Sequence, residues 1–407
     1  MEPVESDTAA QPNRAENSKG KQSLWTRDFV LIAFVNLTTF IGFNMTTTGM
    51  PVYVASLGAS DLTVGLVTTF ATGAALLIRP FTGLMLDRLG HKGILIASIA
   101  AMAVVTAAYA AFPLVGVILA LRIAHGIGWG LGSTATSTIA ADAIPRKRFA
   151  EGMGYFALTS SLAVAVAPAL SIALLQSAGI FPMIAIAAGS TFVSLLLALL
   201  QRPTAKKAAP SKKGRLKASD LFDKRALLPA GIMLLINVAF SSITTFIALH
   251  GQARGVDAIF LYFVVYAAVT IVGRPLIGKA IDRIGFFAPG ILSTIGVIVT
   301  LVIIAFSDNI VMFCIAGIFA GLGIGTGMGT LQAMAVAAVP PERKGVATST
   351  FLFGLDAGIA IGSLVAGSIA GIFGYSGMYL AMTVFPAAAC LALLVAGRKR
   401  VSSYSVY

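Results

Sequence analysis

Residues 79–90 read RPFTGLMLDRLG, and residues 274–285 read RPLIGKAIDRIG. Arg, Pro, Gly, Asp, Arg and Gly stand at the same six places in both stretches, and the offset between residue 79 and residue 274 is 195 positions. A match at a fixed distance, without a gap, indicates an internal duplication. The chain is therefore expected to consist of two equivalent halves.

The same offset aligns further residues downstream of this motif. The pairs are Gly126, Gly128, Gly130 and Gly132 with Gly321, Gly323, Gly325 and Gly327, Pro145 with Pro340, and Arg148 with Arg343. The duplication thus extends over several apolar segments of each half.

The composition indicates that the solvent of these halves is a bilayer. The chain has 407 residues, of which 57% are hydrophobic and 11% are charged. A soluble domain carries about a quarter charged residues, so this chain cannot cover a globule with polar surface. Apolar stretches of about 20 residues, enough to span a membrane as a helix, recur throughout. We place them at residues 29–55, 62–86, 93–112, 114–142, 150–177, 180–201, 227–250, 258–281, 287–306, 309–338, 346–373 and 376–396.

These segments predict an all-α membrane protein with twelve transmembrane helices in two six-helix bundles, at residues 29–201 and 227–396. Parallel repeats of this kind, related by an axis along the membrane normal, imply a central cavity between the halves. An N-terminal tail (1–28), a basic linker (202–226) and a C-terminal tail (397–407) complete the chain.

Positive charge is concentrated in alternate gaps between the apolar segments. The formal net charge is +13, which in a soluble protein would suggest nucleic-acid binding. Here the asymmetry is the positive-inside pattern, with Arg254 as the exception. It predicts an inner-membrane protein that contacts lipid, binds no nucleic acid and has both termini in the cytoplasm. The cations concerned are Arg88, Lys92, Arg146 to Arg148, Lys206, Lys207, Lys212, Lys213, Arg215, Lys217, Lys224, Arg225, Arg343, Lys344 and Arg398 to Arg400.

Motifs of other protein classes are absent from the sequence. Cys314 and Cys390 lie in apolar runs, without the spacing of metal ligands or of a disulfide framework. The glycine-rich stretch 321–329 lacks the Lys-Ser or Lys-Thr of a nucleotide-binding loop, and we interpret it as a helix-packing surface. HExxH and G-x-S-x-G motifs are missing as well. We therefore predict no cofactor, no metal and no enzymatic activity.

The two copies of G-x-x-x-D-R-x-G follow the second and eighth apolar segments. With them, the chain resembles the major facilitator superfamily over essentially all twelve helices. The resemblance implies a secondary transporter of a small molecule that works by alternating access, and we expect a monomer. The segments RIAHGIGWG (122–130) and AEGMGYF (150–156) are most similar to bacterial exporters of drugs and small metabolites, including metallophores.

The resemblance also implies that the repeated motif is a gate, whose charges lock one state of the transporter. Glycine permits close approach of helices, and an aspartate can accept bonds from a helix start or pair with arginine. A static turn cap is the alternative interpretation. The gating residues are Gly83, Asp87, Arg88, Gly90 and Lys92 in the first copy and Gly278, Asp282, Arg283 and Gly285 in the second.

Arg122 is predicted to lie about 12 Å inside the fourth segment, where a charge costs several kcal/mol unless it faces protein, water or a partner. Gly317 stands at the equivalent place in the second half, so Arg122 is not part of the shared scaffold. We assign Arg122 to substrate binding or to control of proton coupling, with a structural hydrogen-bond hub as the alternative. His125 is at the glutamine position of the family's Arg-x-x-Gln-Gly motif. It is a candidate for coupling or, alternatively, a packed and hydrogen-bonded histidine.

Asp356 is the one carboxylate that the sequence places near mid-bilayer, about ten residues into the eleventh segment. An ionisable group at this depth is the default candidate for a proton site. A neutral aspartate bonded to a neighbouring helix is the alternative, because Gly358 and Gly362 follow in a close-packing stretch.

Uncharged polar residues on the first and seventh segments are the candidates for the wall of the cavity. They are Asn36, Asn44, Asn237 and Thr245, on helices that line the cavity in the family that this chain resembles. Such residues suit a substrate with hydrogen-bonding groups, and helix–helix hydrogen bonds are the alternative.

The first functional hypothesis is a proton-coupled exporter of a small organic molecule or drug. Around Pro168, however, the glycines that flank this proline in the family's antiporters are replaced by alanine and serine. This departure favours a second hypothesis, an importer or uniporter of a polar metabolite. A membrane receptor or scaffold without transport is the third.

Overall fold

The computed structural model describes residues 23–145, 148–202, 222–340 and 343–402, and the regular elements within these ranges are all helical. The first half contains α1 (Arg27–Ser56), α2 (Asp61–Leu89), α3 (His91–Ala111), α4 (Val115–Ala143), α5 (Phe149–Ala178) and α6 (Ile180–Leu200). The second half contains α8 (Leu227–Ala253), α9 (Phe260–Ile284), α10 (Phe287–Phe306), α11 (Ile310–Ala320), α12 (Thr326–Ala337), α13 (Lys344–Met382) and α14 (Val384–Ser402).

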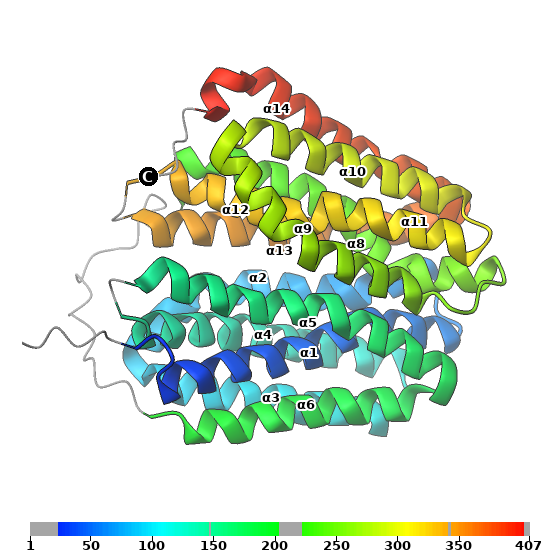
Figure 1. Cartoon of the computed structure of the whole chain (residues 1–407). Coiled ribbons are helices and arrows are strands. Elements are labelled where there is room, and N and C mark those ends of the chain that lie inside the picture. Colours follow the sequence, from blue (N-terminus) through cyan, green and yellow to red (C-terminus); the bar gives the residue numbers. More distant parts are fainter. Residues whose placement is uncertain (1–22, 146–147, 203–221, 341–342, 403–407) are drawn as a thin grey trace, which may run out of the picture.

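The two halves lie against each other along a single seam. Figure 1 shows the first half below and the second half above, with the helices of both running in roughly the same direction. α1 begins and α14 ends at the same end of the bundle, on the left of Figure 1. We call this the terminal end, and the opposite end the distal end.

The predicted twelve spans are present, and the last two follow each other directly across a kink at Gly374. Eleven stretches are long and apolar enough to cross a membrane, and the last of them, Gly345–Gly397, has 53 residues. A helix of that length would measure about 80 Å, whereas the hydrocarbon core of a bilayer is about 30 Å thick. Gly374 interrupts this stretch with φ +67° and ψ 176°, at the break that the sequence predicts between residues 373 and 376.

Some helix boundaries differ from the prediction. α1 begins at Arg27 rather than at residue 29, because the Thr26 side chain accepts a hydrogen bond from the Phe29 N–H at 3.2 Å and caps the helix. α14 continues past the predicted start of the tail to Ser402, with a break at Gly397 (φ +72°). Most of the predicted N-terminal tail and of the linker, at residues 1–22 and 203–221, lies outside the described residues.

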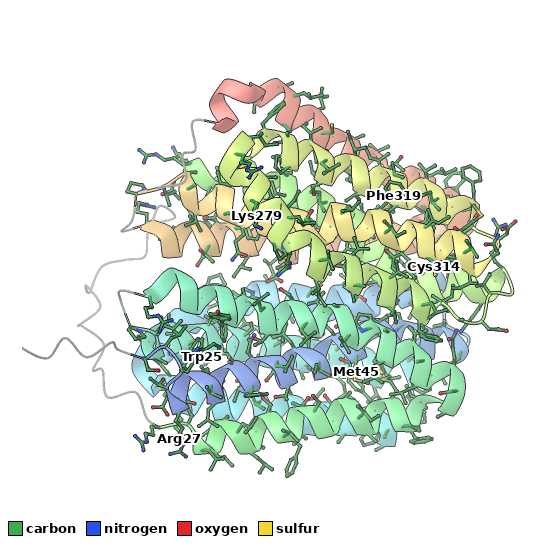
Figure 2. All side chains as sticks on the ribbon, in the orientation of Figure 1. Trp25, Arg27, Met45, Lys279, Cys314 and Phe319 are labelled. Carbon is green, nitrogen blue, oxygen red and sulfur yellow. The ribbon has the colours of Figure 1, made fainter. Side chains whose placement is uncertain are left out.

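Apolar side chains cover much of the outside of the bundle. Figure 2 shows carbon-rich side chains projecting from the outer helices of both halves. Leu77, Ile372 and Val395 are each more than 70% exposed. A soluble monomer rarely presents so much contiguous apolar surface, so this surface fits the hydrocarbon of a membrane.

Glycines bring the helices of each half into close contact. A Cβ atom added to Gly126 of α4 would overlap the carbonyl group of Ala71 on α2, with the carbonyl carbon 2.7 Å away. In the second half, a Cβ atom on Gly296 would lie 2.9 Å from the Cα atom of Gly323. The glycine-rich stretch therefore packs helices, as predicted. The π-helical turn at Gly321–Gly325 was not predicted, because one extra residue in a helical turn leaves no clear signal in apolar periodicity.

Hydrogen bonds join the two halves at several levels of the seam. At the distal end, the Tyr375 hydroxyl of α13 donates to Asp61 Oδ1 of α2 at 2.9 Å. Farther along the same pair of helices, Thr69 Oγ1 donates to the carbonyl oxygen of Ala360 at 3.0 Å. The next level toward the terminal end contains the arginines of the repeated motif.

Candidate functional site

Arg79 of α2 forms an ion pair with Asp356 of α13 across the seam. Arg79 Nε donates to Asp356 Oδ2 at 2.5 Å, and the side chains are 18% and 7% exposed. A second nitrogen of Arg79, Nη1, lies 3.5 Å from Thr134 Oγ1 of α4. The predicted proton site is therefore paired with a cation of the other half.

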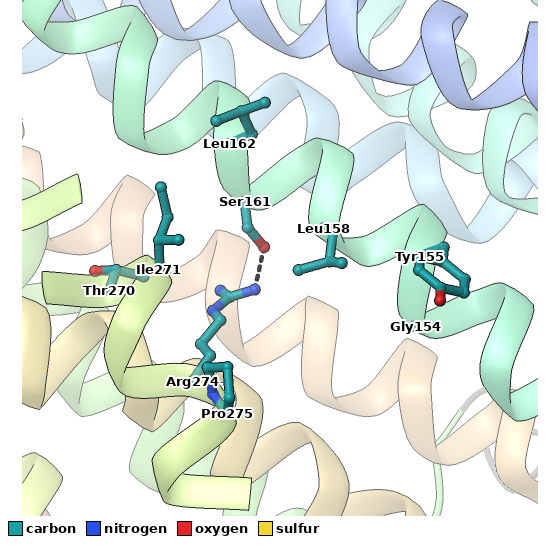
Figure 3. Close-up of a pocket in the computed structure, with 9 residues that line it drawn as sticks. All are labelled: Gly154, Tyr155, Leu158, Ser161, Leu162, Thr270, Ile271, Arg274 and Pro275. Atoms are coloured by element: carbon teal, nitrogen blue, oxygen red, sulfur yellow. Dashed lines mark hydrogen bonds between the residues drawn. The ribbon is translucent and has the colours of Figure 1, made fainter. Parts of the chain in front are cut away.

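The second half repeats this arrangement with one change. Arg274 is the counterpart of Arg79 at the offset of 195 positions, and Ser161 is the counterpart of Asp356. Arg274 Nη1 of α9 donates to Ser161 Oγ of α5, as Figure 3 shows, and Arg274 Nε donates to the carbonyl oxygen of Gly325 at 3.3 Å. The duplicated arginines thus cross the seam in equivalent places.

The two crossings differ in charge. Asp356 can neutralise Arg79, whereas Ser161 offers Arg274 a hydroxyl group alone. The described residues give Arg274 no ion pair. A cation away from water is costly unless an anion or several acceptors compensate for it. Arg274 therefore carries a positive charge that two neutral acceptors only partly satisfy.

A cavity of about 580 Å³ opens between α5 and α9 beside Arg274. Its wall is mostly apolar, and Figure 3 shows Leu158 and Ile271 on either side of the guanidinium, with Leu162 farther along α5 beyond Ser161. The remaining lining residues are Gly154, Tyr155, Ser161, Thr270, Arg274 and Pro275. An apolar pocket with a few polar groups that converge on one point is the usual form of a small-molecule site.

Arg122 is fully buried inside the first half. Its Nε donates to the carbonyl oxygen of Val67 at 2.9 Å, and its Nη1 lies 3.3 Å from Thr46 Oγ1. Its guanidinium carbon is 6.0 Å from the centre of the Phe43 ring. These partners belong to α1 and α2, so Arg122 does not face the seam in this state, and its predicted role in transport stays a prediction.

His125 lies one turn along α4 from Arg122 and is also buried. Its Nδ1 is 3.2 Å from the Tyr109 hydroxyl, and its ring packs edge-on against Phe43 at 5.4 Å. Within the described part of the chain, its Nε2 has no hydrogen-bond partner. A coupling role for His125 stays a prediction.

The four polar residues predicted for the cavity wall have hydrogen bonds with other protein groups. Asn44 and Asn237 each donate to the carbonyl four residues earlier on their own helix, at 2.8 and 2.9 Å. Asn36 donates to two hydroxyl groups of α5. Thr245 lies 3.3 Å from Thr68 across the seam, hydroxyl to hydroxyl. None of the four lines the cavity at Arg274, and their role as substrate contacts stays a prediction.

The repeated loop motif shapes the turns at the terminal end. Gly90 ends α2 with φ +83°, and Gly285 ends α9 with φ +75°, a backbone conformation that glycine adopts without strain. Lys92 Nζ donates to the carbonyl oxygen of Leu199 at 3.0 Å, near the end of α6. Gly278 and Arg283 are exposed. The side chains of Asp87, Arg88 and Asp282, and the surroundings of Gly83, lie outside the described part, so the gating role stays a prediction.

A further ion pair ties α8 to α13 at the terminal end. Asp223 Oδ2 lies 2.6 Å from Arg343 Nε, and Asp223 Oδ1 accepts the backbone N–H of Arg225 at 2.9 Å. The hydrogen bond from Arg225, together with the Arg343 guanidinium, holds the pKa of Asp223 below its usual value against the opposing effect of burial. Asp223 is thus ionised and caps the short turn before α8.

Two bundles of duplicated helices, joined by charged and polar pairs along one seam, are consistent with the resemblance seen in the sequence. A family model described as Major Facilitator Superfamily matches residues 32–311 and 263–405. The chain belongs to the major facilitator superfamily. It is a multi-pass membrane transporter, and the predicted fold is confirmed.

Relatives within the major facilitator superfamily cover most of the chain. An uncharacterized MFS-type transporter of Escherichia coli strain K12, YhhS, is 25% identical over 371 residues, which cover 89% of this chain and 90% of the relative. An uncharacterized MFS-type transporter of Burkholderia mallei strain SAVP1 is 28% identical over 383 residues, with coverage of 88% and 90%. These similarities do not specify a substrate.

Solved structures of this superfamily share the fold at low identity. A structure of a mutant nucleoside transporter NupG has a TM-score of 0.76 at 13% identity and covers 90% of this chain and 99% of its own. A bacterial homolog of the human lysosomal transporter Spinster, in an inward-facing and occupied conformation, has a TM-score of 0.73 at 15% identity, with coverage of 92% and 96%. At these identities, the likeness concerns the fold alone.

Proposed function

We propose that this transporter is a proton-coupled exporter of a small organic molecule, with the Arg79–Asp356 pair as its coupling site. The observation that carries the proposal is a carboxylate, within a membrane-spanning helix, whose ion partner belongs to the opposite half. The pair thus connects a group that can bind a proton with one of the contacts that hold the two halves together.

The state of Asp356 changes the strength of this contact. As a carboxylate, Asp356 accepts a charge-assisted hydrogen bond from Arg79, which is about twice as strong as a neutral one. Once protonated, Asp356 has no charge with which to stabilise the buried guanidinium. Protonation therefore weakens the seam at this level and favours a state in which α2 and α13 separate there.

The position of the pair along α2 gives the proposed direction of opening. Arg79 is about ten residues from the end of α2 at the terminal end, or about 15 Å along the helix. With the termini in the cytoplasm, loss of the pair opens the cytoplasmic side. A proton that enters from outside and binds Asp356 then promotes inward opening, and its release to the cytoplasm allows closure around a substrate, which is exported.

Other features support parts of this proposal. The cavity between α5 and α9 has a mostly apolar wall, which suits an organic molecule with an apolar body better than a polar metabolite. The turns fixed by Gly90 and Gly285 lie at the terminal end of the seam helices, where a gate on the cytoplasmic side would act. Arg122 keeps a proposed supporting role through its contacts with α1 and α2.

Transport in proteoliposomes tests the coupling. Under an imposed pH gradient, the wild type should accumulate a substrate against its concentration, whereas Asp356→Asn should lose this accumulation because residue 356 can no longer exchange a proton. Asp356→Asn should still bind substrate from the cytoplasmic side, since its neutral side chain leaves that side open, and this binding shows that the variant is folded. Ser363→Ala, another change on the seam face of α13, is the matched control and should keep gradient-driven accumulation. Full gradient-driven accumulation by Asp356→Asn would refute the proposed coupling site.

A further inference from the structure

The duplicated arginines offer an internal comparison that extends to the substrate. Arg79 and Arg274 occupy equivalent positions, but a carboxylate of the chain itself neutralises only Arg79. At the place equivalent to that carboxylate stands Ser161, and the cavity lies directly beside it. The anion that completes the first crossing is therefore missing from the second.

We propose that Arg274 binds the anionic group of an amphiphilic organic anion whose apolar body fills the cavity between α5 and α9. This inference rests on the proposed function as a transporter of small molecules, and it names their chemical class. A carboxylate, sulfonate or phosphate group would take from Arg274 the charge-assisted bond that Asp356 takes from Arg79. Leu158, Leu162 and Ile271 would contact the apolar body.

The geometry also provides a matched set of variants. Ser161→Asp places a carboxylate next to Arg274, as in the Arg79–Asp356 pair, and so neutralises the guanidinium without removing it. Ser161→Asn has nearly the same size and adds no charge. Arg274→Gln removes the cation itself. Loss of anion binding in Ser161→Asp with retention in Ser161→Asn would identify charge, rather than space, as the determinant.

Binding is measured on the full chain in phosphatidylcholine nanodiscs, with empty nanodiscs as the blank. The probes are the fluorescent sulfonate 1-anilinonaphthalene-8-sulfonate and its uncharged analogue N-phenyl-1-naphthylamine, which share the same aromatic body. The wild type and Ser161→Asn should bind the sulfonate about tenfold more tightly than the uncharged analogue or better, because a hydrogen bond to a charged group contributes about this much. Arg274→Gln and Ser161→Asp should bind the two probes equally. Equal binding of both probes by the wild type, or unchanged selectivity in both variants, would overturn the proposal.

The anion can come from a free substrate or from a lipid headgroup, and a second lipid composition distinguishes these sources. With part of the phosphatidylcholine replaced by phosphatidylglycerol, a fall in the affinity for the sulfonate that Arg274→Gln does not share would identify the headgroup as an occupant. An unchanged affinity would identify a free organic anion. Selective binding without gradient-driven transport would refute the proposed function alone, and gradient-driven transport without selective binding would refute this inference alone.

Discussion

At the scale of single residues, the sequence identifies Asp356 as a group of interest but does not identify its partner. The depth of Asp356 in its segment follows from counting residues, whereas Arg79 becomes its partner only through the packing of α2 on α13. The offset of 195 positions did hold a usable signal, since it pairs Arg79 with Arg274 and Asp356 with Ser161. For Arg122, the sequence indicates burial, but its contacts with α1 and α2 depend on side-chain directions that a sequence does not give.

Asp223 gives a prediction about stability and pH at this scale. Its pKa is lower in the folded protein than its ordinary value of 3.8, so its contribution to stability is present in full above about pH 4 and is lost as the pH falls through the folded-state pKa. Asp223→Asn should lower the free energy of unfolding at neutral pH by less than about 1 kcal/mol, and so lower the thermal unfolding temperature slightly, because Arg343 is partly exposed and asparagine can still cap the turn.

Thermal unfolding of the wild type and of Asp223→Asn over a range of pH checks this prediction. The difference between them should stay constant down to about pH 4 and close below it. A difference that grows as the pH falls below that value would contradict the assignment of Asp223 as an ionised partner of Arg343.

At the scale of helices, composition and glycine positions predict most of the architecture. The apolar segments give the number of spans, and Gly90 and Gly285 mark two turns at the terminal end. The π-helical turn at Gly321–Gly325 escapes prediction. It depends on local backbone geometry, which apolar periodicity does not report.

The contact between α2 and α4 gives a prediction at this scale. Gly126→Ala should destabilise the first half, because the added methyl group would overlap the backbone carbonyl of Ala71, and overpacking costs about 1–3 kcal/mol. Gly116→Ala on the same helix is the matched control, since nothing lies within 4 Å of the position of its Cβ atom. It should be neutral or stabilise by about 0.4–1 kcal/mol. Thermal unfolding in nanodiscs measures both, and equal unfolding temperatures for the two variants would show that α2 and α4 are not packed as described.

At the scale of the whole molecule, the duplication explains both the fold and the asymmetry within it. Two equivalent bundles meet along one seam, and the same arginine crosses it from each side. One crossing contains a carboxylate and the other a hydroxyl group, which separates a proposed proton site from a proposed anion site. The similar backbones of the two halves allow them to move as equivalent bodies. The carboxylate at one crossing and its absence at the other allow the proposed binding of a proton at Asp356 and of an anion at Arg274.

The central claim is that a proton on Asp356 releases the contact between the halves at the terminal end. The most direct test is a distance measurement by pulsed electron paramagnetic resonance between spin labels on Leu89→Cys of α2 and Ser349→Cys of α13, two exposed positions near the terminal end. The free cysteines Cys314 and Cys390 would first be replaced by serine. From about pH 8 to about pH 5, a range in which a perturbed carboxyl group can titrate, the distance should lengthen in the otherwise wild-type protein. In Asp356→Asn it should be long at both pH values. A distance that does not change with pH, or that changes in Asp356→Asn as it does in the wild type, would contradict the claim.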